Sequence, residues 1–164
     1  MNQTNSTALK LTQGAAIAAI YVVLTMVFAP ISFGAMQVRI AEAMTIMPLF
    51  TPMAIPGLFI GCLFANLLGG AVVLDVVFGS IATLIGAWGG WLLRKNRWLV
   101  PIPAILANTV IVPLVLKYGY GVDLPLLLSA LYIAVGEILG CYVLGEILAS
   151  ALIRRGLFFG SRKK

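Results

Sequence analysis

Few side chains in this sequence could do chemistry, and most of them are carboxylates and amides. The chain has 164 residues, of which 10% are charged and five are acidic, and it contains no histidine. Three of the acids, Glu42, Asp75 and Glu137, lie within or at the ends of long apolar stretches. An ionised side chain at membrane depth costs about 2.5 to 3.5 kcal/mol, so such a residue usually faces a cavity or a partner. These three acids therefore predict a polar site inside an apolar protein.

Neutral amides and one cation accompany the acids. Asn66 and Asn108 fall inside apolar stretches, where an amide also needs hydrogen-bonding partners. Gln37 and Arg39 lie in the short polar connection just before Glu42, and we expect this connection to act as a lid. Together these groups would offer donors and acceptors to a polar heterocycle in a cavity that opens outward. The predicted substrate-binding residues are Gln37, Arg39, Glu42, Asn66, Asp75, Asn108 and Glu137.

A purely structural interpretation of the same residues stays open. Arg39 could pair with Glu42 one helical turn away, Asp75 could cap its own helix, and the asparagines could bond neighbouring helices. Glu137 is the strongest candidate, because no cation lies near it in the sequence and its burial needs a ligand, a remote Arg39 or a proton.

The elements that must position these residues are membrane helices. A hydrophobic content of 62% is more than a small soluble core can hide, and the apolar stretches match the roughly 20 residues that cross about 30 Å of hydrocarbon. The stretch from Ile40 to Gly70 would measure about 46 Å as one helix, and Pro48, Pro52 and Pro56 interrupt it. The sequence thus predicts an all-α integral membrane protein, a six-transmembrane-helix bundle forming one domain over residues 1–164. The predicted spans are about 11–30, 41–50, 54–68, 72–93, 99–116 and 126–153.

The basic residues predict the orientation of these spans in the cell (plasma) membrane. Arg39 and Lys117 lie on one predicted side, and all the other cations lie on the opposite side. Those others are Lys10, Arg94, Lys95, Arg97, Arg154, Arg155, Arg162, Lys163 and Lys164. Lys and Arg accumulate in cytoplasmic segments, so both termini are predicted to be cytoplasmic. The cations form no stripe with interleaved aromatic residues, which argues against a nucleic-acid partner.

Small side chains on the first span form a second pattern. Gly14, Ala15, Ala18 and Ala19 contain two four-residue repeats, and such repeats let helices approach closely. On residue types alone, packing within the chain and docking of an external partner remain equally open. Cys62 and Cys141 fall inside predicted spans, where a small residue that tolerates apolar surroundings is the usual interpretation and a metal or disulfide pair is not.

Several functional signatures are absent from the sequence. It has no Gly-rich phosphate loop followed by Lys and Ser or Thr, and no polar stretch large enough for a nucleotide-binding domain. It also has no paired nucleophile and base within the spans. We therefore predict a transport subunit that is not an enzyme, needs no cofactor and depends on a partner for energy.

Three segments carry a resemblance to a known family: QVRIAEAMTIMP (37–48), NLLGGAVVLDVVFGSIATL (66–84) and AVGEILGCYVLG (134–145). They closely resemble the queuosine-precursor transporters, which are similar to substrate-binding (S) components of energy-coupling-factor (ECF) ABC importers. The resemblance implies six helices, a transmembrane coupling protein and two ATPase subunits as partners, and inward delivery by reorientation of the loaded subunit. It also implies that a small-residue motif on the first helix docks the coupling protein, for which Ala15 with Ala19, or Gly14 with Ala18, has the right spacing.

The resemblance further implies a deazaguanine base as substrate, held near the outer face. Its guanine-like edge offers adjacent N–H donors to a carboxylate, and its carbonyl accepts from Arg or Asn. Two alternatives remain: the same machinery importing the larger cobalamin, and a self-sufficient proton-coupled permease. The lack of a detectable inverted repeat argues weakly against the permease.

Overall fold

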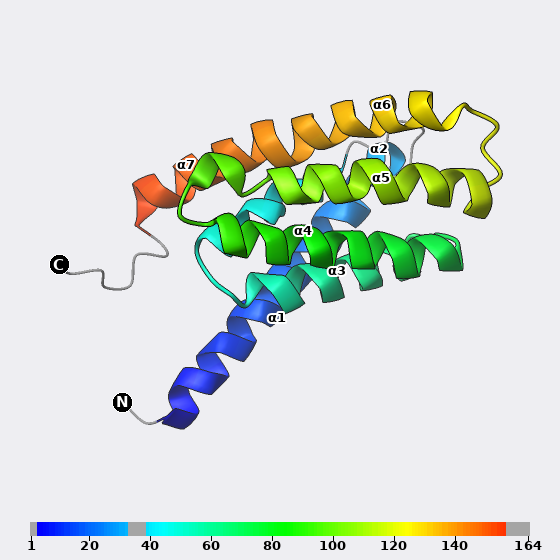
Figure 1. The fold of residues 1–164 in the computed structure, drawn as a ribbon. Coiled ribbons are helices and arrows are strands. Elements are labelled where there is room, and N and C mark those ends of the chain that lie inside the picture. The colour runs from blue at the N-terminus through cyan, green and yellow to red at the C-terminus, as the bar shows by residue number, and fades with distance from the viewer. Residues whose placement is uncertain (1–2, 33–38, 157–164) are drawn as a thin grey trace.

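The structure is a computed structural model that describes residues 3–32 and 39–156, and no strand occurs among them (Figure 1). The long helix α1 (Gln3–Val27) is followed by the short α2 (Ala29–Ser32). The chain continues as the 3₁₀ helix η1 (Ile40–Leu49), which contains Pro48, and then as α3 (Ala54–Leu68). The described first part of the chain therefore contains one long helix and three shorter ones after it.

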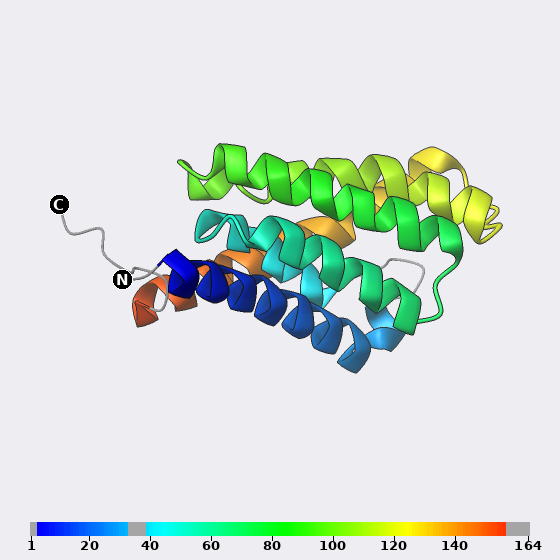
Figure 2. The ribbon, with the colours of Figure 1, turned by 90° about the horizontal axis from the view of Figure 1, so that it is seen from below.

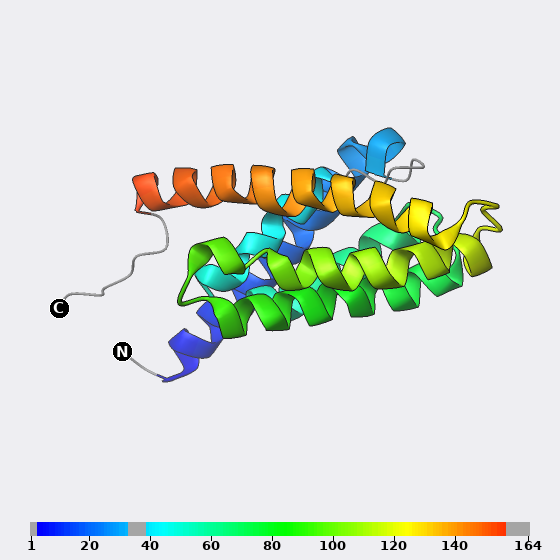
Figure 3. The same cartoon turned by 45° about the horizontal axis from the view of Figure 1, so that its top comes forward.

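The second part of the chain consists of longer continuous helical stretches, which we call rods. A π-helical turn, η2 (Asp75–Gly79), leads directly into α4 (Ser80–Leu93). The 3₁₀ turn η3 (Arg97–Leu99) connects α4 to α5 (Ile102–Gly119). The last rod joins α6 (Leu126–Glu137), the π-helical η4 (Ile138–Leu144) and α7 (Gly145–Arg155) without a break, as Figure 3 shows.

Four helical stretches of the described chain are long and apolar enough to cross a membrane: Thr7–Val27, Asp75–Leu93, Arg97–Gly119 and Leu126–Arg155. The chain is thus an all-α membrane protein. The predicted count of six spans is not matched by six helices of spanning length, because the segments predicted at 41–50 and 54–68 correspond to η1 and α3. At rises of about 2.0 and 1.5 Å per residue these helices measure about 20 and 22 Å, short of the roughly 30 Å of hydrocarbon.

The helices from α3 to α7 run roughly along one direction and α1 crosses them obliquely, and the chain reverses at each end (Figures 1 and 2). The start of α1, the end of α7 and the link between α4 and α5 lie at one end, whereas the link between α5 and α6 lies at the other. The 3₁₀ helix η1 contacts α1, α3, α4, η4 and α7. Residues at the start of η1 are therefore surrounded by several helices.

Glycines allow the helices to pack with little space between backbones. A Cβ atom at Gly57 of α3 would lie 2.8 Å from the Gly14 carbonyl oxygen, and one at Gly61 would lie 2.9 Å from Cβ of Tyr21. A Cβ at Gly86 of α4 would lie 2.6 Å from Cα of Ala104 in α5. Such small residues are typical of interfaces between membrane helices. Packing of α1 on α3 and of α4 on α5 therefore depends on the absence of a side chain at these positions.

Apolar side chains dominate the surface of the helices as well as their interior. Large apolar residues face outward along the rods, among them Trp88, Leu106 and Val110, which are 59 to 65% exposed. Several ionisable and amide side chains are buried instead. This arrangement suits a hydrocarbon surrounding, in which polar groups must find their partners inside the protein.

Candidate functional site

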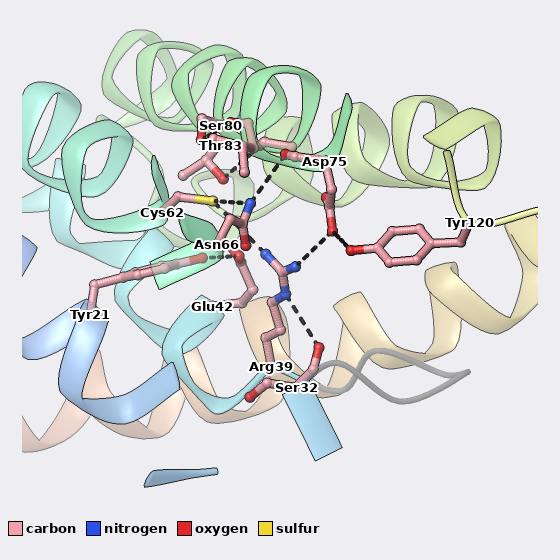
Figure 4. A network of polar contacts seen from close by, with 12 residues as sticks. Tyr21, Ser32, Arg39, Glu42, Cys62, Asn66, Asp75, Ser80, Thr83 and Tyr120 are labelled. Carbon is pink, nitrogen blue, oxygen red and sulfur yellow. Dashed lines mark hydrogen bonds and ion pairs between the residues drawn. The ribbon is translucent and has the colours of Figure 1, made fainter. Parts of the chain in front are cut away.

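Six of the seven predicted substrate-binding residues are buried in one region, which we call the polar cluster, and Figure 4 labels four of them. Each of them is 7% exposed or less, and Gln37 lies outside the described residues. The members of the polar cluster are Arg39, Glu42, Asn66, Asp75, Asn108 and Glu137. They come from η1 and its N-terminal flank, α3, η2, α5 and α6, so five separate segments contribute to one site.

One half of the polar cluster is organised around Asp75. A terminal nitrogen of Arg39 lies 3.7 Å from Asp75 Oδ2, and the Tyr120 hydroxyl donates a hydrogen bond of 2.9 Å to the same oxygen. Arg39 Nε also donates to the Ser32 carbonyl at 3.4 Å. Burial and the nearby Asp75 carboxylate raise the pKa of Tyr120 to about 12, so its hydroxyl keeps its proton at neutral pH. These contacts tie the start of η1 to the start of η2 and the end of α5.

Asn66 connects this half to α3. Its amide nitrogen donates to the Asp75 backbone carbonyl at 3.1 Å and lies 3.7 Å from the Cys62 sulfur. Asn66 Oδ1 and Asp75 Oδ1 are buried and have no hydrogen-bond partner among the described residues. Buried polar atoms are nearly always paired in folded proteins. Two acceptor oxygens are thus available to the N–H groups of a ligand.

A glycine makes room for these two side chains. A Cβ atom at Gly79 would lie 2.7 Å from Asp75 Oδ1 and 3.2 Å from the amide nitrogen of Asn66. The contact with Asp75 Oδ1 is shorter than real Cβ atoms make, so a side chain at this position would require the carboxylate to shift. Glycine at this position therefore sets where the Asp75 carboxylate can lie.

The other half of the polar cluster brings two glutamates together. The Tyr21 hydroxyl of α1 donates to Glu42, and the Cys141 thiol donates to Glu137 at 3.0 Å. The same sulfur lies 3.9 Å from Glu42 Oε2, and the Asn108 side chain lies beside the Glu137 carboxyl. One carboxylate oxygen each of Glu42 and Glu137 and the Cys141 sulfur lie within 4.8 Å of one another. Among the described residues, these three could together hold a metal ion.

Charge is not balanced within the polar cluster. It contains three carboxylates, Glu42, Asp75 and Glu137, and the single guanidinium of Arg39. Arg39 forms its ion pair with Asp75, where Tyr120 adds a further hydrogen bond. Ionised carboxylates in a low-dielectric interior require a cation or a proton. The glutamate half of the site is therefore suited to a ligand that carries positive charge or several N–H donors.

Irregular backbone accompanies the two acids that lie on long rods. Asp75 begins the π-helical turn η2, and Glu137 directly precedes the π-helical η4. Single π-helical turns inside α-helices are frequent at functional sites. A Cβ atom at Gly140 in η4 would lie 2.9 Å from the Arg39 carbonyl oxygen, so η4 also approaches the start of η1 closely.

The structural interpretation of these residues holds in part. Asn66 does bond a neighbouring segment, as that interpretation expected. Asp75 is not the cap of its own helix, because Leu74 occupies the capping position and no side-chain cap is present. The other two acids lie away from the site: Asp123 is exposed in the α5–α6 connection, and Glu146 pairs with Arg97 at 2.6 Å.

Sequence reasoning missed four members of this network: Tyr21, Cys62, Tyr120 and Cys141. The signal for the cysteines was present, because Cys62 precedes Asn66 by four residues and Cys141 follows Glu137 by four. Residues four apart share one face of a helix. The tyrosines offered no comparable signal, since their partners lie on other elements.

The predicted partner-docking residues divide into two faces of α1. Gly14 and Ala18 face α3, where Gly57 and Gly61 approach them. Ala15 and Ala19 are exposed. The four-residue repeat of Gly14 and Ala18 is thus used for packing within the chain, and the repeat of Ala15 and Ala19 is left on the surface.

Comparisons with known proteins agree with this picture of a membrane transport protein. The QueT transporter family matches residues 11–154. The chain is similar to the queuosine precursor transporter QueT of Lactococcus lactis subsp. cremoris (strain MG1363), with 37% identity over 73 residues. That alignment covers 43% of this chain and 43% of the relative, so it spans less than half of the relative's length. No solved structure matches the chain. Because the family match extends over most of its length, this chain belongs to the QueT transporter family.

Proposed function

We propose that this chain is the substrate-binding subunit of an ECF-type importer and captures a queuosine precursor, a deazaguanine base, at the outer face of the cell membrane. Family membership and the name of the Lactococcus relative support the substrate class. The observation that carries the proposal is the polar cluster, a buried set of acceptors with more carboxylates than cations. A soluble anion or an apolar ligand would gain little from such a site.

The chemistry of a deazaguanine fits the two halves of the polar cluster. Adjacent N–H donors on its guanine-like edge can be accepted in pairs by a carboxylate such as Glu42 or Glu137. The free Oδ1 atoms of Asn66 and Asp75 accept further donors. An aminomethyl precursor adds a cation, which would offset the charge of the glutamate half. We therefore propose the aminomethyl form as the preferred substrate.

Six membrane passes with both termini in the cytoplasm form part of the proposal. The start of α1, the end of α7 and the α4–α5 link share one end of the bundle (Figure 1). The segment Arg94–Arg97 and Arg154–Arg155 are also at this end, which favours a cytoplasmic position. In this arrangement η1 and α3 are the two short passes, and the polar cluster lies toward the outer face.

Binding of a panel of ligands to the purified chain tests the substrate. We expect calorimetry in detergent to give the tightest binding for the aminomethyl precursor, weaker binding for queuine, the cyano precursor and guanine, and none for cobalamin. Loss of one charge-assisted contact costs about 1.5 to 3 kcal/mol, so the cyano form should bind roughly 10- to 150-fold more weakly than the aminomethyl form. Binding of cobalamin alone would show that the substrate is wrong although the family stands. Uptake by the lone chain in liposomes under a pH gradient would support the permease instead.

Energy for transport would come from a transmembrane coupling protein and two ATPase subunits. The exposed pair Ala15 and Ala19 on α1 is the proposed docking face, since Gly14 and Ala18 already pack on α3. Partner binding would let the loaded chain reorient in the membrane and release its ligand inward.

The double substitution Ala15→Leu and Ala19→Leu is expected to abolish co-purification with the coupling protein while substrate binding by the isolated chain is unchanged. Two added isobutyl groups prevent the close helix contact that small residues permit. Ala16→Leu is the matched control, because Ala16 is also exposed on α1 but lies about 100° around the helix from Ala15. If Ala16→Leu reduced co-purification as much as the double substitution, the loss would not be specific to the face of Ala15 and Ala19, and that face would not be the docking site.

A further inference from the structure

The end of the bundle opposite to the polar cluster has a hollow between η3 and α7. Its volume is about 370 Å³. Its lining mixes polar and apolar side chains: Arg97 and Trp98 come from η3, and Glu146, Ile147, Ser150, Ala151 and Arg154 come from one face of α7. A site that offers both polar and apolar side chains at the end of membrane helices suits a molecule that is itself charged at one end and apolar at the other.

The polar part of the lining is built around the guanidinium of Arg97. Arg97 Nε donates to Glu146 at 2.8 Å, and a terminal nitrogen of Arg97 donates to the Ser150 hydroxyl at 3.0 Å. The same guanidinium lies over the Trp98 ring, 4.6 Å from its centroid. Glu146 Oε1 is buried and has no partner among the described residues. Arg97 is therefore held rigidly at the edge of the hollow, with Glu146 as its counterion.

Positive charge exceeds negative charge around the hollow. In the α4–α5 link and in α7, five cations accompany one carboxylate, that of Glu146. The cations are Arg94, Lys95, Arg97, Arg154 and Arg155. Arg94 lies over the Trp91 ring at 3.6 Å, so a second indole sits among them. Tryptophan beside Arg and Lys is typical of the level of lipid headgroups.

An apolar track leads away from the hollow along the last rod. Val135, Leu139, Val143 and Ile147 follow one another at four-residue spacing and are 43 to 61% exposed. Ala151, the next residue in this series, lines the hollow itself. A headgroup in the hollow would leave its acyl chain next to this track. A free inorganic anion would make no use of it.

We propose that this hollow is a binding site for an anionic phospholipid, with the headgroup phosphate accepting hydrogen bonds from Arg154 and Ser150 and an acyl chain lying along the track from Ile147 to Val135. The charge balance selects an anionic lipid over a zwitterionic one. The site goes beyond the proposed transport function and does not depend on the substrate.

Native mass spectrometry of the delipidated chain in detergent tests the proposal. We expect phosphatidylglycerol to bind more tightly than phosphatidylcholine with the same acyl chains, and Arg154→Gln to weaken phosphatidylglycerol binding by about fivefold. Arg155→Gln is the matched control, because it removes the same charge one residue away and Arg155 does not line the hollow. It should weaken binding less than twofold. Both side chains are exposed, so the thermal midpoints of both variants should equal that of the wild type.

Three results would overturn the proposal. An equal loss of phosphatidylglycerol affinity in Arg154→Gln and Arg155→Gln would mean that only the general surface potential attracts the lipid. Displacement of the lipid by excess inorganic phosphate or glycerol phosphate would identify a free-anion site. Equal binding of both lipids, with Arg154→Gln reducing only assembly with a protein partner, would identify a protein interface.

Discussion

Replacing Glu137 with glutamine should weaken binding of the queuosine precursor by about 100-fold. Glu137 lies in the glutamate half of the polar cluster, away from the Arg39–Asp75 ion pair, and its carboxylate accepts from Cys141. The amide has no charge to offer a cationic ligand, and one of its two terminal atoms is a donor where the ligand also donates. Removing one member of a buried charge pair costs about 2 to 5 kcal/mol, and 100-fold lies within that range.

Stability measurements separate this effect from misfolding. Glu137→Gln should leave the thermal midpoint of the unliganded chain unchanged or raise it, because it replaces a buried acid, whose ionised form is costly to bury, with a neutral amide of similar size. The control is Asp123→Asn, the same change at an exposed position in the α5–α6 connection, and it should bind as the wild type does. Wild-type affinity in Glu137→Gln would exclude Glu137 from the site, and the substrate would have to bind elsewhere.

The class of protein follows from composition, but the lengths of its helices do not. Apolar stretches separated by charged segments predict membrane helices, and four of them have spanning length. The segment 41–50 is apolar too, yet it forms the 3₁₀ helix η1, whose different rise and tight turns depend on its packing among α1, α4, η4 and α7. Hydropathy reports the preference for lipid and carries no information on such contacts.

The members of the site were easier to predict than their partners. A buried acid or amide is conspicuous in an apolar sequence, and five such residues lie in the polar cluster with Arg39. The pairing of Arg39 with Asp75 joins η1 to η2, and the bond from Tyr21 to Glu42 joins α1 to η1. Spacing along the chain indicates neighbours within one helix only. Contacts between helices require the packing that Gly57, Gly61 and Gly140 make possible.

A single methyl group at Gly79 should disturb the site without touching a ligand. In Gly79→Ala the new Cβ would lie 2.7 Å from Asp75 Oδ1, so the carboxylate must turn away and its contacts with Arg39 and Tyr120 must lengthen. We expect roughly tenfold weaker ligand binding by calorimetry and a loss of about 1 kcal/mol in stability, at the low end for overpacking. In Gly145→Ala the methyl would meet only ordinary contacts of 3.4 and 3.6 Å, so this control should bind normally.

The mechanism of the Gly79 effect can be checked with a double-mutant cycle. If the methyl acts by displacing Asp75, then adding Gly79→Ala to an Asp75→Ala background should cost little further affinity, because the group that it displaces is already gone. Additive losses would instead mean that the methyl distorts the helix η2–α4 or blocks the ligand directly. Non-additive losses would show that the missing side chain at Gly79 leaves the room in which the Asp75 carboxylate binds the ligand.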